Sequence, residues 1–405
     1  MKGRETEVYV TGMGVVSPLG SGLAVTSEAL RLGRRGLSPL TRFDASFSRC
    51  RVAGEARGFV PGEGRSRLEA LAEEAAGQAL FQAAQGGRPG GLEGLDPSRL
   101  AVFVSSSKGG MEAFPGLGKP DLGKSLEKFL SHEPGAVLRR SLGWTGGGGN
   151  YPLACATGGY SLGAAYEAIA EGRLDAALAG SVEASLTPLV WRSFDGLGVL
   201  APLGEDASAL RGPFDLDRQG FALGEGAGVV FLESGASLKR RGARPLAEMA
   251  GWACTADAHE ALAPDPQGRQ AGRCLALALE KAGPARAGGL GYLNAHGTGT
   301  RAGDAAEAGA IRLALGDRAA GLMVSGTKAA TGHLLGAAGS VEAVFTLIAL
   351  LEGRVPATLG VRRPMPGLGF DLVWEGAREC RLESAASLSM GFGGHNVAVV
   401  FRKPG

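Results

Sequence analysis

Residues 290–352 contain the pattern that decides the fold. They open with LGYLNAHGTGT at 290–300, a short apolar strand that runs into a loop of small residues. The pattern then predicts a helix over 303–315, a strand over 322–325 and a second helix over 336–352. Strands that alternate with helices favour parallel sheets with helices on both faces. This segment therefore predicts an α/β fold.

The same alternation extends toward both ends of the chain. The further strands are expected over 8–16, 100–104, 176–179, 386–390 and 397–401, and the further helices over 66–84, 159–171 and 268–282. Residues 111–150 are predicted to be irregular. Pro245 marks a boundary at which the pattern restarts, so we expect one domain over 1–245 and a second over 246–405.

Composition narrows the class of protein. A net charge of +2 indicates no nucleic-acid partner and no membrane-surface role. The five cysteines show no CxxC spacing, which argues against a zinc site and against a disulfide framework and favours a reducing compartment. The most apolar window, 344–351, is too short to span a bilayer, and the N-terminus lacks a signal-peptide core. We expect a cytoplasmic protein.

Three loops of small residues carry reactive side chains. Cys155 lies between alanines just before a predicted helix, where the positive helix end favours a thiolate. His296 follows the strand 290–294, and Lys328 precedes His333 by five residues. A thiol, two imidazoles and an ammonium are the groups needed to form a carbon–carbon bond on a thioester.

The order Cys, His, Lys, His resembles the decarboxylating beta-ketoacyl-acyl-carrier-protein synthases, or ketosynthases. The resemblance begins at VTGMGVVSPLG over 10–20 and closes at GFGGHN over 391–396, so it spans almost the whole chain. It implies the thiolase fold, in which two similar halves pack as five αβαβα layers. The N-terminal half would supply Cys155 and the C-terminal half both histidines.

The resemblance implies a role for each reactive residue. Cys155 would hold the acyl group, and His296 and His333 would stabilise the enolate that forms when a malonyl thioester loses carbon dioxide. Lys328 would shape the electrostatics around the second histidine. Glu307 and Glu342 match the acidic residues that support the site.

Further positions match the substrate-binding parts of the family. Phe392 resembles the aromatic gate that admits acyl chains, and its backbone N–H would join that of Cys155 in an oxyanion hole. Thr298 and Thr300 match positions that bind phosphopantetheine. Lys108 falls where housekeeping synthases place an apolar residue of the acyl tunnel, which hints at a specialised pathway. Arg65 and Arg67 are candidates for docking an acidic carrier protein.

The implied reaction is condensation of an acyl group on Cys155 with malonyl-acyl-carrier protein. It needs no metal and no cofactor beyond the phosphopantetheine arm of the carrier. The implied partners are acyl carrier protein and a second ketosynthase-like subunit, in a homodimer or a heterodimer. Two alternatives share the fold: a thiolase, and a chain-length-factor-like partner without activity. The chain keeps Cys155, which such partners generally lose, and has Phe392 where a thiolase has its second cysteine.

Overall fold

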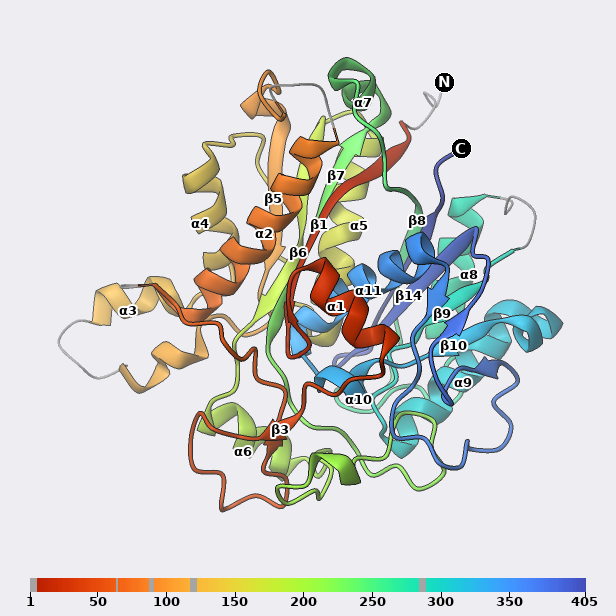
Figure 1. Ribbon diagram of the computed structural model, residues 1–405. Helices are drawn as coiled ribbons and strands as arrows, with labels where there is room; N and C mark the ends of the chain where they lie inside the picture. The colour runs from red at the N-terminus through yellow and green to blue at the C-terminus, as the bar shows by residue number, and fades with distance from the viewer. Residues whose placement is uncertain (1–5, 63–64, 87–90, 117–121, 284–288) are drawn as a thin grey trace.

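The computed structural model describes residues 6–62, 65–86, 91–116, 122–283 and 289–405. One eleven-stranded sheet runs in the order β12-β10-β9-β14-β15-β8-β1-β7-β6-β5, with β2 beside β1 (Figure 1). Its strands are β1 (Val8–Ser17), β2 (Gly20–Ser21), β5 (Leu100–Ser105), β6 (Ala176–Glu183), β7 (Gly226–Ser234), β8 (Ala247–Ala256), β9 (Tyr292–Asn294), β10 (Met323–Ser325), β12 (Asp371–Leu372), β14 (Ser384–Gly391) and β15 (His395–Arg402). Two small sheets pair β3 (Ser38–Pro39) with β4 (Val52–Ala53) and β11 (Arg354–Val355) with β13 (Arg378–Glu379).

The large sheet has two parts that meet at β1 and β8. These strands pair over only two positions, Tyr9 with Glu248 and Val10 with Ala247. The N-terminal part holds β5, β6, β7 and β1, and the C-terminal part holds β8, β15, β14, β9, β10 and β12. The short β1–β8 contact lets the two parts turn toward each other around a shared helical layer.

The expectation of purely parallel sheets is wrong. β5–β6, β9–β14, β9–β10 and β10–β12 are parallel, but β1–β7, β6–β7, β8–β15 and β14–β15 are antiparallel. β14 and β15 are joined by residues 392–394 alone, and so short a connection can only make a hairpin. The sheet is therefore mixed.

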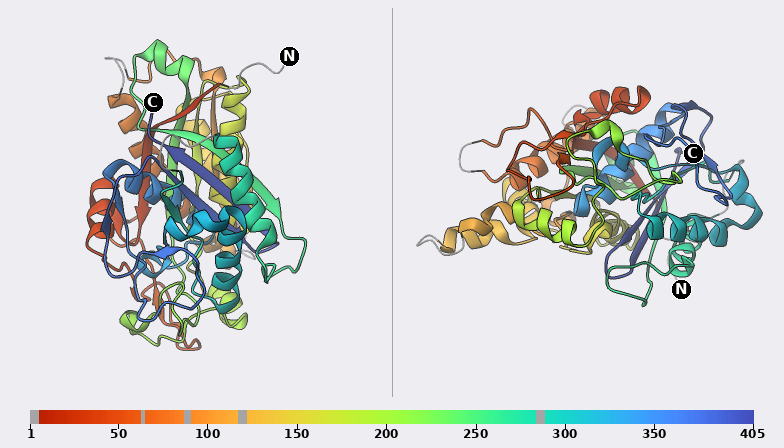
Figure 2. Two further views of the ribbon diagram at one scale, coloured as in Figure 1. Left: turned by 90° about the vertical axis from the view of Figure 1, so that its right-hand side faces the viewer. Right: turned by 90° about the horizontal axis from the view of Figure 1, so that it is seen from below.

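Helices cover both faces and also fill the space between the two parts (Figures 1 and 2). Outside the N-terminal part, α2 (Arg67–Gln85) packs on β1 and β7, and α4 (Glu133–Leu142) packs on β5. In the middle, α5 (Thr157–Ala170) contacts β6, and α11 (Ala338–Glu352) contacts both β7 and β14. Outside the C-terminal part, α8 (Arg269–Ala282) packs on β8 and β15 and against α9 (Arg301–Leu315). The result is the expected αβαβα layering.

Five further α-helices lie in the connections of the described residues. They are α1 (Leu23–Arg31), α3 (Leu122–Phe129), α6 (Pro188–Gly196), α7 (Gly235–Arg241) and α10 (Lys328–Thr331). The presence of α3 and α4 corrects the expectation that 111–150 is irregular. Pro134 is tolerated because it lies in the first turn of α4, and Gly143 ends that helix in a left-handed conformation. Val137 and Leu138 anchor α4 in the core. Because the helix has so few large apolar residues, its sequence shows no clear helical period.

The middle layer is packed closely because its helices have glycine at their contacts. A Cβ on Gly158 would lie 2.3 Å from the amide nitrogen of Ser340, and one on Gly339 would lie 2.9 Å from that of Gly159. The segment Leu335–Glu352 has the length and mean hydropathy of a membrane span, but 89% of it is buried inside the protein. It is the core helix of the fold, and it packs against α5 and against the turn Ala154–Ala156 that carries Cys155.

Candidate active site

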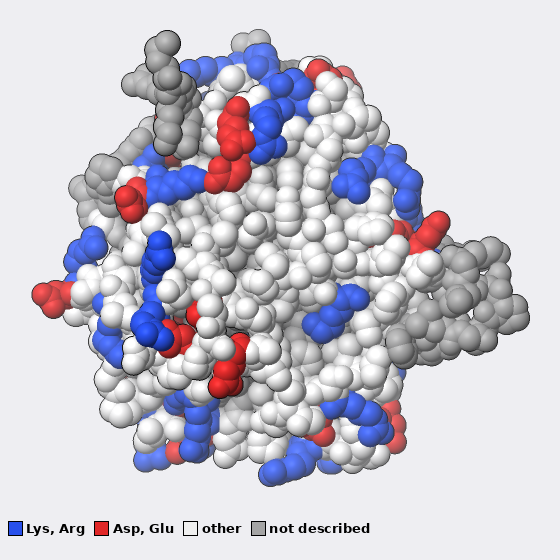
Figure 3. Space-filling model, turned by 180° about the vertical axis from the view of Figure 1, so that it is seen from behind, with Lys and Arg blue, Asp and Glu red and all other residues white. Residues whose placement is uncertain are grey.

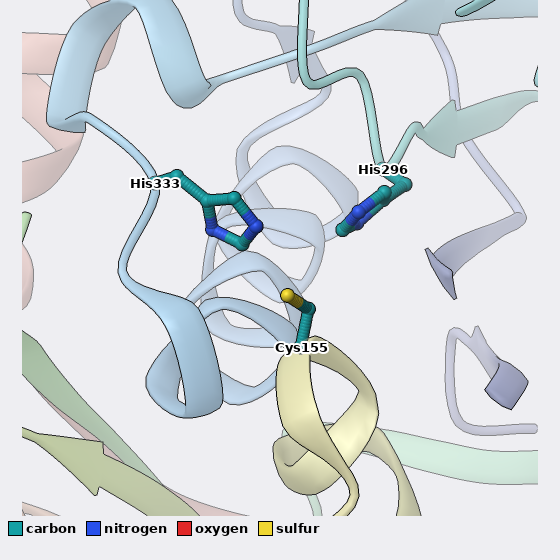
Figure 4. Close-up of side chains that lie close together, drawn as sticks. All are labelled: Cys155, His296 and His333. Carbon is teal, nitrogen blue, oxygen red and sulfur yellow. The ribbon is translucent and has the colours of Figure 1, made fainter. Parts of the chain in front are cut away.

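Cys155, His296 and His333 converge at the contact between the two halves (Figure 4). All three are buried, and their Sγ and ring nitrogen atoms lie within 4.8 Å of one another. The two imidazole rings meet edge to face, with centroids 5.5 Å apart. Cys155 comes from the 3-10 turn Ala154–Ala156 just before α5, His296 from the loop after β9 and His333 from the loop after α10.

The turn that presents Cys155 is strained and locally braced. Ala154 has a φ of 48°, a left-handed value that a residue with a side chain rarely adopts. The Thr157 hydroxyl accepts a hydrogen bond from the Leu153 amide (2.9 Å) and donates to the Ala154 carbonyl (2.8 Å). Burial raises the pKa of the Cys155 thiol, opposed by the charges of Lys108 and Lys328. Burial therefore opposes the thiolate that the helix end was expected to favour.

Backbone geometry makes the imidazole of His333 a hydrogen-bond donor. Its Nδ1 accepts a hydrogen bond from the Leu335 amide at 3.1 Å. A neutral imidazole has one donor and one acceptor nitrogen, so Nε2 then bears the proton. Burial, with Lys328 and Lys108 next, holds the pKa of His333 well below its usual value, so the ring is neutral at pH 7.

Lys328 places the ring proton of His296 on Nε2 as well. Its Nζ lies 3.4 Å from Nδ1 of His296, donates to the His296 carbonyl and bonds to Oε1 of Glu342 at 2.5 Å. An ammonium can only donate, so Nδ1 is the acceptor and Nε2 carries the proton. Burial and the Lys328 charge hold the pKa of His296 well below its usual value. Both imidazoles therefore present Nε2–H.

Two acids on α9 hold the backbone of the His296 loop. Glu307 accepts hydrogen bonds from the amides of His296 (2.6 Å) and Gly297 (2.8 Å), and burial raises its pKa to about 8. Asp304 accepts from the Gly299 amide at 3.0 Å and pairs with Arg218 at 3.0 Å. Sequence reasoning identified Glu307 but missed Asp304, whose position one helical turn earlier on the same face was the available signal.

Glu342 is the buried counter-charge of Lys328. Both side chains are almost fully buried, and burial raises the pKa of Glu342 to about 7 while Lys328 opposes the rise. Removing either partner would leave the other charge uncompensated in the core, which is strongly destabilising.

The tautomers of the two histidines at this site oppose metal binding. One thiol and two imidazoles are ligand types that zinc accepts, and their atoms are close enough. However, a metal at Nε2 would need the lone pair there, whereas the Leu335 amide and Lys328 ammonium place the proton on that nitrogen. The arrangement supports hydrogen-bond donation instead.

A cavity of about 190 Å³ leads to the thiol. Cys155, His296 and His333 line it together with Thr298 and Thr300. The two threonine hydroxyls are 2.9 Å apart, and Thr300 also caps α9 by accepting from the Gly303 amide. A cavity with two hydroxyls in its wall suits a partly polar substrate arm.

Phe392, Phe194 and Phe221 line one side of the cavity and form its aromatic wall. The Phe392 ring stacks on Phe194 with centroids 6.1 Å apart and planes 18° apart, and Phe221 contacts the imidazole of His333 at 5.0 Å. Gly391 comes so near the nucleophile turn that a Cβ there would lie 3.3 Å from the Cys155 amide nitrogen. The segment before Phe392 therefore lies beside that amide.

Lys108 lies partly buried behind this aromatic wall. Its Nζ is 5.7 Å from the centroid of the Phe194 ring and 3.2 Å from the Ser107 hydroxyl. The ammonium is close enough to the thiol and to His333 to lower the pKa of both groups. Lys108 is not part of the cavity lining itself; Phe194 is.

Arg65 and Arg67, the two candidates for docking a carrier protein, differ in their exposure to solvent. Arg67 is buried and bonds to both oxygens of Glu225 at 2.6 and 2.9 Å, so its assignment to a docking surface is wrong. Arg65 remains accessible and pairs with Glu73 at 2.8 Å. Arg67, the first residue of α2, thus stabilises the fold instead of facing a partner.

Comparisons with known proteins agree with this geometry. Residues 5–237 match the sequence model of the beta-ketoacyl synthase N-terminal domain, and residues 246–362 match that of the C-terminal domain. The 3-oxoacyl-[acyl-carrier-protein] synthase 2 of Synechocystis sp. is 35% identical over 412 residues, with 98% of each chain covered. The enzyme of the same name from Staphylococcus aureus is 34% identical with the same coverage.

Solved structures share the fold over the whole chain. One is a ketosynthase in a type II PKS complex with its acyl-carrier protein, described as bound to the hexaketide (29% identity, TM-score 0.89, 99% and 100% of the two chains). Another is the ishigamide ketosynthase/chain length factor (30% identity, TM-score 0.89, with the same coverage). Both domain models match the sequence in the family's order, and the structure brings Cys155, His296 and His333 together in one buried site. The chain belongs to the beta-ketoacyl synthase family.

Proposed function

We propose that the protein catalyses decarboxylative condensation of an acyl group on Cys155 with a malonyl-acyl-carrier protein. The observation that carries the proposal is the pair of neutral imidazoles, His296 and His333, that both present Nε2–H beside the thiol. Two such donors fit an enolate oxygen, the charge that develops when a malonyl thioester loses carbon dioxide.

The first half-reaction moves the acyl group to the protein. Cys155 Sγ forms a bond to the acyl carbon, the carrier's C–S bond breaks, and the thiol proton ends on the carrier sulfur. The backbone N–H groups of Cys155 and Phe392 are proposed to hold the tetrahedral oxyanion. The close approach of Gly391 to the Cys155 amide supports this pairing.

The second half-reaction builds the carbon–carbon bond. The bond from the malonyl carbon to its carboxylate breaks, carbon dioxide leaves, and the electron pair becomes an enolate that His296 and His333 stabilise. The enolate carbon attacks the acyl group on Cys155, and the Cys155 thiolate leaves and takes a proton from solvent. The products are a beta-ketoacyl carrier and carbon dioxide. Lys328, Glu342 and Glu307 orient the donors.

The carrier's phosphopantetheine arm is proposed to occupy the cavity past Thr298 and Thr300, and it is the only prosthetic group that the reaction requires. The relatives named for acyl-carrier-protein substrates and the solved complex with such a carrier support this partner. We further propose a cytoplasmic location, and two sequence halves, 1–245 and 246–405, that each supply part of the site.

Lys108 bears on the choice of acyl chain. We propose that its ammonium, beside Phe194, disfavours long saturated chains, since a chain placed against it would desolvate the charge at a cost of several kcal/mol. Short, polar or unsaturated acyl groups would be preferred. This fits a specialised pathway better than bulk fatty-acid synthesis.

The experiment is incubation of the protein with acyl-carrier-protein thioesters followed by malonyl-carrier, with mass spectrometry of both proteins. Wild type should gain the acyl mass on Cys155 and then release beta-ketoacyl carrier. Cys155→Ala should do neither. Condensation by the alanine variant would refute the proposal, and acylation without condensation would favour a partner subunit or a thiolase.

A further inference from the structure

Glu183, the last residue of β6, is a buried acid outside the site described so far. Its side chain is 0% exposed. Five hydrogen bonds are donated to its two oxygens, by the Ser106 hydroxyl (3.2 Å), the Ser107 amide (3.2 Å), the Ser107 hydroxyl, the Ser185 hydroxyl (2.5 Å) and the Gly336 amide (3.1 Å). Within the described ranges, no lysine or arginine nitrogen lies within 4.0 Å of it. Hydrogen bonds, then, are what hold this acid in the core.

The Gly336 amide belongs to the turn that controls His333. Leu335, just before it, has a φ of 50°, a strained value that persists only where surrounding contacts impose it. The Leu335 amide donates to Nδ1 of His333 at 3.1 Å. Any Cβ on Gly336 would lie 2.5 Å from Oε2 of Glu183 and 2.7 Å from Cβ of Ser107, so the turn sits directly on this acid.

We propose that Glu183 is a positioning residue that fixes the tautomer of His333. Its carboxyl group accepts a hydrogen bond from the Gly336 amide and so holds the strained turn. The turn directs the Leu335 amide at Nδ1 of His333, which leaves the ring proton on Nε2. If the turn relaxes, Nδ1 loses its donor, and the neutral ring can place its proton there instead. Nε2 would then be an acceptor and could not donate to an enolate oxygen.

Ser107 ties the same acid to the loop after β5. Its hydroxyl donates to Glu183 and accepts from Nζ of Lys108 at 3.2 Å. Lys108, beside the aromatic wall of the cavity, is thus two hydrogen bonds from the carboxylate that supports His333. The network joins the loop after β5, the end of β6 and the segment before α11, three places far apart in the sequence.

The test measures the tautomer of His333 directly by NMR. The protein is labelled with ¹⁵N at its five histidines, and the His333 signal is assigned by its loss in His333→Asn. Glu183→Leu removes the acceptor, and Glu183→Asp keeps the carboxyl group on an arm one methylene shorter. Both should move proton population from Nε2 to Nδ1. Glu183→Gln should stay close to wild type, because its carbonyl oxygen can accept from Gly336 while its amide donates to the serine hydroxyls.

Ser185→Ala is the matched control, since it removes one donor to Glu183 and leaves the acceptor for Gly336 in place. It should keep the wild-type tautomer. A wild-type spectrum for folded Glu183→Asp would overturn the proposal, and this variant decides the matter if Glu183→Leu does not fold.

A second readout rests on the proposed function. In a Cys155→Gln background, Glu183→Leu and Glu183→Asp should release carbon dioxide from malonyl-carrier about 100- to 1,000-fold more slowly, the loss typical of one missing donor. With Cys155 intact, acylation should change far less. If Cys155→Gln alone fails to decarboxylate, the proposed function is at fault. If it decarboxylates and Glu183→Asp does so equally fast, the role of Glu183 is refuted.

Discussion

At the level of single residues, His296 and His333 reach the same protonation pattern by different means. A lysine ammonium faces Nδ1 of His296, and a backbone amide faces Nδ1 of His333. Burial is the largest cause of the low pKa of both rings. A neutral donor is what an enolate needs, because an imidazolium would lose its proton to the enolate and quench it.

The low pKa values predict how decarboxylation responds to acid. An ordinary histidine, with a pKa near 6.5, is half protonated at pH 6.5, whereas these two stay neutral there. Carbon dioxide release by Cys155→Gln should therefore be nearly constant from pH 7.5 to 6.5 and fall only below that. Glu342, with a pKa of about 7, titrates in the same range, so the protonation of His296 and His333 is followed separately by NMR of the ¹⁵N-labelled rings. Half-protonated rings at pH 6.5 would contradict the assignment.

Lys108 makes a separate prediction on chain length. Lys108→Ile replaces the ammonium beside Phe194 with an apolar side chain, so acylation of Cys155 by long saturated chains should rise relative to short or polar ones. The measurement is the profile of Cys155 acylation across a chain-length series. Arg65→Ile, an exposed cation away from the cavity, is the control. An unchanged profile would leave Lys108 without influence on the substrate.

At the level of elements, the placement of Cys155 depends on how closely α5 approaches α11. Gly158→Ala would put a methyl group 2.3 Å from the Ser340 amide nitrogen, so the helices must separate and move the nucleophile. We expect a loss of about 1–3 kcal/mol in unfolding free energy and slower acylation. Gly77→Ala lies on the solvent-exposed side of α2, where an added Cβ meets open space, and should stabilise the protein by up to about 1 kcal/mol. Equal effects on melting temperature in both variants would contradict this packing account.

The elements also show what the sequence could predict. Long helices such as α2, α8 and α11 follow from helix-forming composition, an apolar period or a long apolar run. Cys155, His296, Lys328 and His333 stand out because small residues surround each of them. The direction of strand pairing did not follow, because it depends on partners far away in the chain. Glu183 and Asp304 were missed for the same reason: their hydrogen bonds join segments up to 153 residues apart. An acid that ends an apolar strand, as Glu183 does, was the only local signal.

At the level of the whole molecule, β5 lies at one end of the large sheet, with residues 146–148 hydrogen-bonded along its outer side, and we expect a second subunit at this end. Figure 3 shows that the face opposite the viewer of Figure 1 has its charged side chains mainly toward the margins, and interface cores are depleted of charge. We predict a dimer by light scattering at micromolar concentration. A chain that stays monomeric, even when a homologous partner subunit is supplied, would contradict this expectation.

The central claim is that two neutral imidazoles, set by their neighbours as Nε2–H donors, drive decarboxylation beside a separate thiol nucleophile. The most direct test is carbon dioxide release from malonyl-acyl-carrier protein by Cys155→Gln, alone and combined with His296→Ala or His333→Ala. The single variant should release carbon dioxide without an acceptor, and each double variant should be about 100- to 1,000-fold slower. Equal rates in all three proteins would contradict the account.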